Sequence, residues 1–249
     1  MTQEDIAAAA RLLAEARRGG APLAALPVVP GSIAEAHAIQ DATAALLGQP
    51  IGGFKTAAVG DDPPSRGLLY AHTIHPSPAR IPAAEVPLCG VEGEVAFRFT
   101  RDLPPRAAPY TREEVAAAME ACAAIEVVTS RFQDQAQRAT LEKLADCVSN
   151  GAFVHAAPVA DWRGLDLVNI HVTLQVNGET VLDQNGGNPS GDPLKVATAL
   201  ANMLRDGAGI RAGQFATCGT FTGLRFLKPG DTCVARFAGL GTAEVTFVP

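Results

Sequence analysis

The stretch Val91-Glu92-Gly93-Glu94-Val95-Ala96-Phe97 decides the architecture that this sequence predicts. Side chains in a β-strand alternate between its two faces, so Glu92 and Glu94 point the same way and the apolar residues pack behind them. A third carboxylate, Glu126, lies within the apolar run of residues 123–128. Because a carboxylate is rarely buried unless something positive meets it, the three together indicate a cation site.

Each glutamate taken alone has a simpler explanation. Two glutamates two residues apart are more often a solvated strand face than a metal site. Glu126 equally fits the rim of a helix or an ion pair with Arg131. The combination favours a metal, because three hard oxygen ligands from two segments suit Mg²⁺ or Mn²⁺ and leave coordination positions open for a substrate.

The composition limits the class of protein. The 249 residues fit one large domain, or one domain with a small N-terminal appendage. A net charge of −6 without a Lys/Arg cluster argues against a nucleic-acid or anionic-membrane surface. No apolar stretch is long enough to span a bilayer, and the acidic N-terminus is unlike a signal peptide. The five cysteines lack Cys-x-x-Cys spacing, so we expect free thiols in the reducing cytoplasm.

The hydrophobic pattern predicts an α+β fold. We expect a helical N-terminal region over residues 1–50, followed by a β-rich catalytic domain over residues 51–249, the two forming one structural unit. Helices are expected at residues 3–18, from the Ser32 N-cap to about Leu47, at 111–122 and at 193–206. Strands are expected at residues 51–57, 68–74, 86–99, 151–156, 166–176, 179–183, 214–219, 232–238 and 242–248.

Three further segments carry chemistry that suits a site. Lys55 is the only charged residue in the apolar stretch 51–59, where it is either an edge lysine or directed at a site. The polar loop 146–151 and the glycine-containing segment 216–223 fit either ordinary turns or substrate contacts. The histidines show no metal-binding spacing, and nucleophile-elbow, P-loop and dinucleotide motifs are absent from the sequence.

Taken in sequence order, these segments resemble the 2-keto-4-pentenoate hydratase family, within the fumarylacetoacetate-hydrolase-like superfamily. The resemblance extends over nearly the whole chain. The most specific element is the double-glutamate strand, followed 32 residues after Glu94 by Glu126 in Ile125-Glu126-Val127-Val128-Thr129-Ser130-Arg131. The other matching motifs are Gly53-Phe54-Lys55, Ala145-Asp146 with Ser149, Gly191-Asp192-Pro193-Leu194, Cys218-Gly219 and Pro229-Gly230-Asp231.

The resemblance implies a mixed-sheet body of the fumarylacetoacetate-hydrolase C-terminal-domain type. It also implies Mg²⁺ or Mn²⁺ held by Glu92, Glu94 and Glu126. The substrate would be a small 2-oxo or 2-hydroxydienoic acid that chelates the metal, which would stabilise enolate charge. The residues implied as catalytic are Lys55 and Glu94, and the implied substrate contacts are Ser149, Arg66 and Thr220.

The implied reaction is that of a metal-dependent hydro-lyase, which adds water to an unsaturated 2-oxo acid. Three alternatives stay open: decarboxylation or tautomerisation at the same site, C–C hydrolysis of an acylpyruvate, and a catalytically weakened paralogue that assembles with an active lyase. The resemblance also suggests a homo-oligomer.

The sequence departs from the family pattern in two places. An Asp-aromatic-Gly motif is expected after the Lys55 segment, but Ser65-Arg66-Gly67-Leu68-Leu69 stands there, and the spacing of Asp61 and Asp62 does not match. Cys218-Gly219 replaces the usual Thr-Gly. Arg66, beside the vacant aspartate position, predicts a substrate with an extra negative charge.

Overall fold

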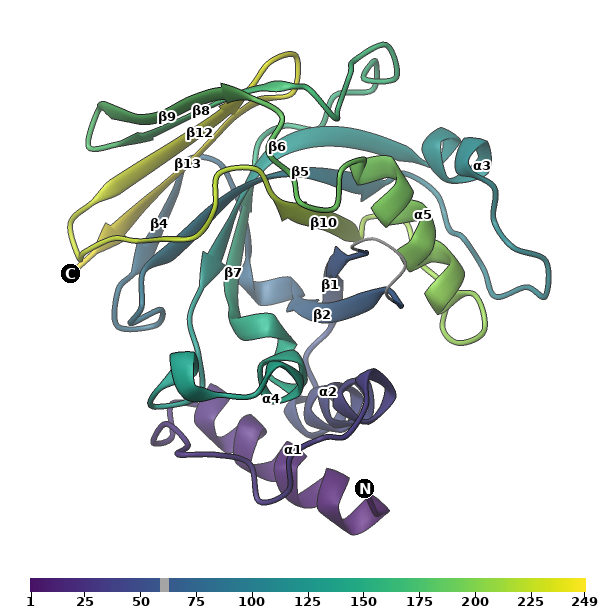
Figure 1. Ribbon diagram of the computed structural model, residues 1–249, viewed down its shortest axis with the longest axis vertical. Coiled ribbons are helices and arrows are strands. Elements are labelled where there is room, and N and C mark those ends of the chain that lie inside the picture. The colour runs from purple at the N-terminus through teal and green to yellow at the C-terminus, as the bar shows by residue number, and fades with distance from the viewer. Residues whose placement is uncertain (59–62) are drawn as a thin grey trace.

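Two β-sheets and a group of helices make up the protein in the computed structural model, which describes residues 1–58 and 63–249 (Figure 1). The helices are α1 (Gln3–Arg17), α2 (Ile33–Leu47), α3 (Arg112–Ala117), α4 (Thr140–Ala145) and α5 (Pro193–Leu204). In spatial order, the larger sheet contains β2 (Ser65–Tyr70), β1 (Ile51–Ala57), β10 (Phe215–Thr220), β5 (Gly90–Phe99), β6 (Met119–Val128), β7 (Asn150–His155) and β3 (Ile74–Pro76), with β11 (Arg225–Phe226) paired to β5. The smaller sheet contains β4 (Ala79–Pro82), β13 (Gly241–Val248), β12 (Thr232–Phe237), β8 (His171–Val176) and β9 (Glu179–Asn185).

The N-terminal helices form where their capping residues predict. The Thr2 hydroxyl accepts a hydrogen bond from the Asp5 amide at the start of α1, and the Ser32 hydroxyl accepts one from the Glu35 amide at the start of α2. Helix α1 packs on α2, and α2 packs on α4, and the three share a hydrophobic cluster separate from the core of the β-sheets. Figure 1 shows these helices together at one end of the molecule.

Strands β5 and β6 form the centre of the larger sheet, and their ten-residue antiparallel ladder is in register throughout. The helix predicted over residues 111–122 is therefore wrong beyond Ala117, because Met119–Val128 is a strand. The alanines in this segment favour a helix locally, but the strand is buried on both faces between β5 and β7, and tertiary packing outweighs propensity. Strands β4 and β11 were not predicted from the sequence.

The two faces of β5 have different environments. Gly93 faces the smaller sheet so closely that an added Cβ would lie 2.8 Å from the Thr222 side chain and 3.4 Å from Ala235. Since neighbouring residues alternate, Glu92 and Glu94 point away from the smaller sheet. In the described chain, no helix has the length and apolar character that crossing a membrane requires.

Candidate metal centre

The structure brings the three predicted metal ligands together. The β5–β6 register places Glu92 directly opposite Glu126, and Glu94 follows Glu92 on the same face of β5. One carboxylate oxygen from each residue lies within 4.8 Å of the other two. Glu94 and Glu126 are buried, while Glu92 is partly exposed.

Glu94 is held in place by strand β10. Its Oε2 accepts hydrogen bonds from the Thr217 hydroxyl and from the Gly219 amide, the latter at 3.0 Å. The β10–β5 pairing shifts register between Thr217 and Thr220, and Gly219 adopts a φ of +94° there. This irregularity turns a backbone N–H toward the carboxylate, which is a role that glycine performs without steric cost.

Glu126 has one satisfied and one unsatisfied oxygen. Its Oε1 lies 2.6 Å from Lys55 Nζ and accepts a hydrogen bond of 3.1 Å from the Asn150 amide. Its Oε2 is buried and has no hydrogen-bond partner in the described chain. A buried carboxylate oxygen without a partner requires an explanation, and a metal ion supplies one.

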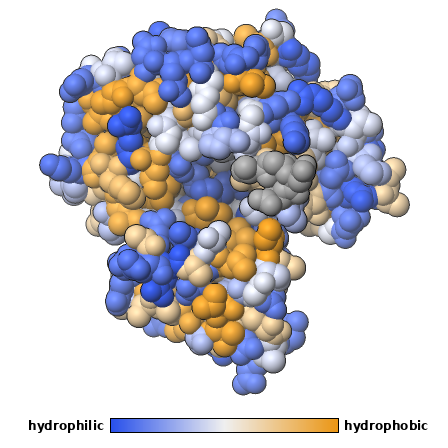
Figure 2. All heavy atoms as spheres, viewed as in Figure 1, coloured by the Kyte–Doolittle hydropathy of each residue, from blue (hydrophilic) through white to orange (hydrophobic). Residues whose placement is uncertain are grey.

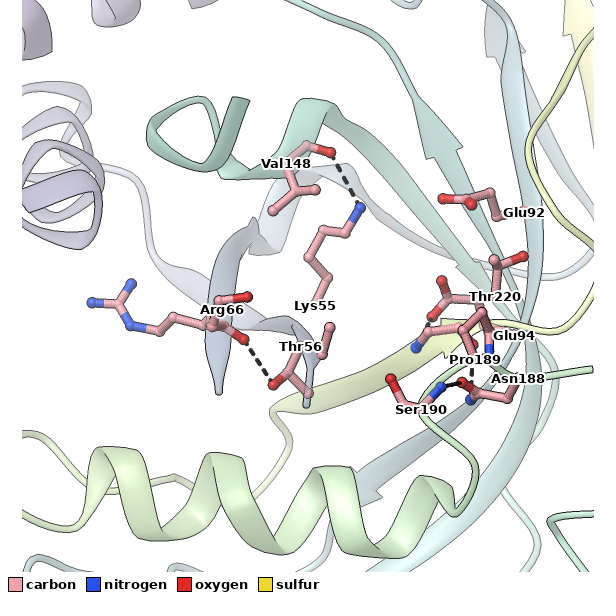
Figure 3. A pocket seen from close by; sticks show the side chains of 13 residues that line it. Lys55, Thr56, Arg66, Glu92, Glu94, Val148, Asn188, Pro189, Ser190 and Thr220 are labelled. Atoms are coloured by element: carbon pink, nitrogen blue, oxygen red, sulfur yellow. Dashed lines mark hydrogen bonds between the residues drawn. The ribbon is translucent and has the colours of Figure 1, made fainter. Parts of the chain in front are cut away.

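Lys55 is the positive charge in this group. It comes from β1, and its ammonium group also donates a hydrogen bond of 3.2 Å to the Val148 carbonyl (Figure 3). Burial lowers the pKa of Lys55, but attraction to Glu126, Glu92 and Glu94 outweighs that effect and raises the pKa above its ordinary value. Lys55 therefore stays protonated.

The pKa values of Glu92 and Glu94 are raised above the ordinary value of a glutamate. Burial, followed by repulsion from Glu126, raises the pKa of Glu92 to about 7. Burial, followed by repulsion from Glu126 and Glu92, raises the pKa of Glu94 to about 8. Three carboxylates and one ammonium carry a net charge of −2 when all are ionised, and a divalent cation would neutralise it. The donor set, the unsatisfied oxygen and the charge all fit Mg²⁺ or Mn²⁺.

A cavity of about 240 Å³ opens in front of the carboxylates. Figure 2 shows this side of the molecule hollowed, with hydrophilic surface in the hollow. Its wall includes Thr220, as predicted, and Asn188 and Ser190, which the sequence analysis did not identify (Figure 3). Asn188 donates hydrogen bonds to the carbonyls of Cys218 and Gly219, so the loop before α5 is fixed against β10. A cluster of turn-forming residues at 188–191 was the only signal available for this loop.

Two predicted substrate contacts are placed differently. The guanidinium of Arg66 points away from the carboxylates (Figure 3) and binds both oxygens of Asp41, at 2.7 and 2.8 Å. Ser149 is buried outside the cavity lining, where its hydroxyl accepts a hydrogen bond from Gln135, and Val148 lines the cavity instead. This placement gives no support to a contact between either side chain and the substrate.

Two further interpretations of the sequence concern an ion pair of Glu126 and a substitute for the missing aspartate. An ion pair between Glu126 and Arg131 is wrong, because Arg131 binds Asp146 and Glu126 binds Lys55. Asp61 and Asp62, considered as substitutes for the missing aspartate, lie outside the described residues.

Comparison with known proteins decides the family. Residues 67–248 match the family described as fumarylacetoacetate (FAA) hydrolase C-terminal. The chain belongs to the fumarylacetoacetate hydrolase family. It is 32% identical to a 2-keto-4-pentenoate hydratase of Burkholderia vietnamiensis (strain G4 / LMG 22486), with 97% of each chain covered. The predicted resemblance to the 2-keto-4-pentenoate hydratases is thereby confirmed, as is the α+β fold.

Other members of the fumarylacetoacetate hydrolase family carry different activities. The chain is 27% identical to a 4-oxalocrotonate decarboxylase of Pseudomonas putida, over 78% of this chain and 73% of the relative. A solved 4-oxalocrotonate decarboxylase from Pseudomonas putida G7, complexed with magnesium and adipate, superposes with a TM-score of 0.84 at 23% identity and covers 100% and 99% of the two chains. The prediction that this protein is an enzyme is confirmed by these named relatives.

Proposed function

We propose that this protein is a Mg²⁺- or Mn²⁺-dependent hydratase that adds water to a small, unsaturated 2-oxo acid with one carboxylate. The observation that carries the proposal is the convergence of Glu92, Glu94 and Glu126, with Lys55 as the only cation of this group among the described residues and an unsatisfied oxygen on Glu126. A metal chelated by the carboxylate and the C2 oxygen of such an acid would act as a Lewis acid and stabilise enolate charge.

The protein side chains would have separate roles in binding the metal and in stabilising charge on the substrate. Glu92, Glu94 and Glu126 would hold the metal, Glu94 through the oxygen that Thr217 and Gly219 leave free. Lys55 Nζ donates to Glu126 and to the Val148 carbonyl, and an ammonium group has three donors, so one is left for an oxygen of the substrate. Because this charge persists at neutral pH, Lys55 would stabilise the negative charge that develops on that oxygen as the dienol loses its hydroxyl proton and becomes a ketone by gaining a proton at carbon.

The polar residues that line the cavity favour hydration over decarboxylation of a dicarboxylic acid. The lining includes Thr56, Asn188, Ser190 and Thr220, which are neutral hydrogen-bonding groups. In the described part of the chain, Lys55 is the only lining side chain whose positive charge faces the cavity, because Arg66 is bound to Asp41. A second carboxylate would lack a cationic partner there, whereas a neutral double bond and an incoming water fit hydroxyl and amide groups.

The test is mass-resolved product analysis of 2-hydroxydienoic and acylpyruvic acids incubated with the protein and Mg²⁺. We expect a gain of one water by a monocarboxylic dienoic acid, abolished by a chelator and by Glu126→Gln. Loss of CO₂ from a dicarboxylic acid would assign the site to decarboxylation, and fragmentation of an acylpyruvate would assign it to hydrolysis. Metal binding without turnover of any acid would indicate a weakened paralogue. A homo-oligomer in the cytoplasm stays a prediction.

A further inference from the structure

The turn that carries Val148 has an unusual backbone. Cys147, Val148 and Ser149 are consecutive residues with φ values of +54°, +52° and +60°, and none of them is glycine. The left-handed conformation is unfavourable for a residue with a Cβ, and a β-branched residue such as valine adopts it rarely. Interactions around the turn must therefore hold it in place.

This turn contacts both members of the central ion pair. The Val148 carbonyl accepts the 3.2 Å hydrogen bond from Lys55, and the side-chain Nδ2 of Asn150, the residue after the turn, donates the 3.1 Å hydrogen bond to Glu126. Lys55 and Glu126 are themselves 2.6 Å apart. The left-handed conformation thus directs the Val148 carbonyl at Lys55, and the strand that follows the turn presents the Asn150 side chain to Glu126.

Asp146, which precedes the turn, is fully buried and is held by two arginines. Arg131 donates to its carboxylate from Nε at 2.5 Å and from the backbone amide at 3.0 Å, and donates to its carbonyl at 3.1 Å. Arg17 donates from Nη2 to the same carboxylate and the same carbonyl, both at 3.2 Å. One guanidinium suffices to balance the charge of Asp146, so charge balance alone does not account for Arg17.

Arg17 lies in the last turn of α1, and the chain travels 129 residues before it reaches Asp146. Helix α1 also packs on α2, and α2 packs on α4, which leads directly into Asp146. Leu13, Ile39 and Leu144 belong to the hydrophobic cluster that these helices share. Figure 1 shows α1, α2 and α4 together on the side of β1 and β2. The N-terminal helices therefore hold the start of the turn by both packing and an ion pair.

We propose that Arg17 is a positioning residue: through Asp146 it holds the Cys147–Ser149 turn in the conformation that fixes Lys55 against Glu126. Its effect on catalysis rests on the proposed function, but its effect on Lys55 does not. Arg17 contacts neither the cavity nor the carboxylates of Glu92, Glu94 and Glu126. It acts through Asp146 and the backbone of the turn.

The test compares Arg17→Met, Arg17→Lys and Arg18→Met by two measurements. The first is the rate at which Lys55 is acetylated by limiting acetic anhydride, measured by mass spectrometry against Lys143, Lys195 and Lys228 as internal references. The second is steady-state turnover with Mg²⁺. Arg17→Met leaves the Arg131–Asp146 pair intact and is expected to fold, which circular dichroism checks. Arg18 is the matched control, because it is the next residue and donates instead to the Leu46 carbonyl.

In Arg17→Met we expect faster acetylation of Lys55 and a fall in kcat of about tenfold, equivalent to about 1.4 kcal/mol, with a smaller change in KM. Arg17→Lys should recover part of both effects, and Arg18→Met should match the wild type. Unchanged Lys55 acetylation in folded Arg17→Met overturns the proposal, as does altered acetylation with unchanged kcat. If the wild type turns over no acid, the proposed function fails, while the acetylation rates still decide whether Arg17 positions Lys55.

Discussion

Binding of Mg²⁺ to the metal-free protein should release protons, and the number released should depend steeply on pH. Metal ligands must be deprotonated to bind, so each proton that Glu92 or Glu94 carries in the metal-free protein has to leave. The pKa of Glu92 is raised to about 7 and that of Glu94 to about 8, by burial first and by mutual repulsion of the carboxylates second. The two residues interact, so the release belongs to the pair.

The magnitude follows from these two values. At about pH 6 the pair holds nearly two protons, and at about pH 9 it holds roughly 0.1. Mg²⁺ should therefore expel about two protons in the acidic buffer and almost none in the alkaline one. The same competition should weaken Mg²⁺ binding about a thousandfold between the two conditions, equivalent to about 4 kcal/mol.

Isothermal titration calorimetry in pairs of buffers with different ionisation enthalpies measures both quantities. Glu92→Gln is the matched control, because it removes one titrating ligand and should reduce the proton release at about pH 6 by about one. Release of less than half a proton by the wild type at about pH 6 would refute the reasoning, as would Mg²⁺ affinity that does not change with pH.

Three further outcomes can be measured on the same protein. Lys55→Met should lower kcat by about a hundredfold, measured by steady-state kinetics. It should not weaken Mg²⁺ binding, measured by calorimetry, because it removes a positive charge that repels the metal. Between pH 4.5 and about 8 the folded, metal-free protein binds more protons at Glu92 and Glu94 than the unfolded chain, so calorimetric stability should fall as pH rises through this window, and saturating Mg²⁺ should remove the slope. Asp146→Ala should cost about 3–5 kcal/mol in the free energy of unfolding, measured by urea denaturation, because it leaves two buried guanidinium groups unpaired.

The convergence of the three carboxylates could be predicted in part from the sequence because a strand fixes the direction of its side chains. Once residues 91–97 are identified as a strand, Glu92 and Glu94 share a face, and no knowledge of the partner strands is needed. Glu126 was identified for the opposite reason, since a carboxylate in an apolar run needs a partner. Its secondary structure stayed open, because alanine-rich runs suit both helices and doubly buried strands.

The substrate contacts were harder to predict because they depend on tertiary neighbours. Arg66 lies in β2 with its side chain facing α2, and only the position of Asp41 in that helix reveals that the charge of Arg66 is already paired. Ser149 and Val148 are neighbours in a turn of left-handed residues, and no local sequence pattern predicts that Val148 rather than Ser149 lines the cavity. Asn188 and Ser190 reach the site because their loop is bound to β10, across about thirty residues of sequence.

The positive charge of Lys55 determines which metal-ion charge and which substrate charge the site can neutralise. With Glu92, Glu94 and Glu126 ionised, Lys55 leaves a charge of −2, so a monovalent cation would leave the buried group negative and a trivalent cation would make it positive. A divalent ion brings the site to neutrality, and a bound monocarboxylate then adds one negative charge, which the third N–H of Lys55 and the metal can share. A dicarboxylate would bring a second charge toward Asn188 and Ser190, which offer hydrogen bonds without a compensating charge. Replacing Ser190 with arginine should therefore raise kcat/KM for a dicarboxylic acid relative to a monocarboxylic one, and an unchanged ratio would show that the charge of the cavity lining at Ser190 does not select the substrate.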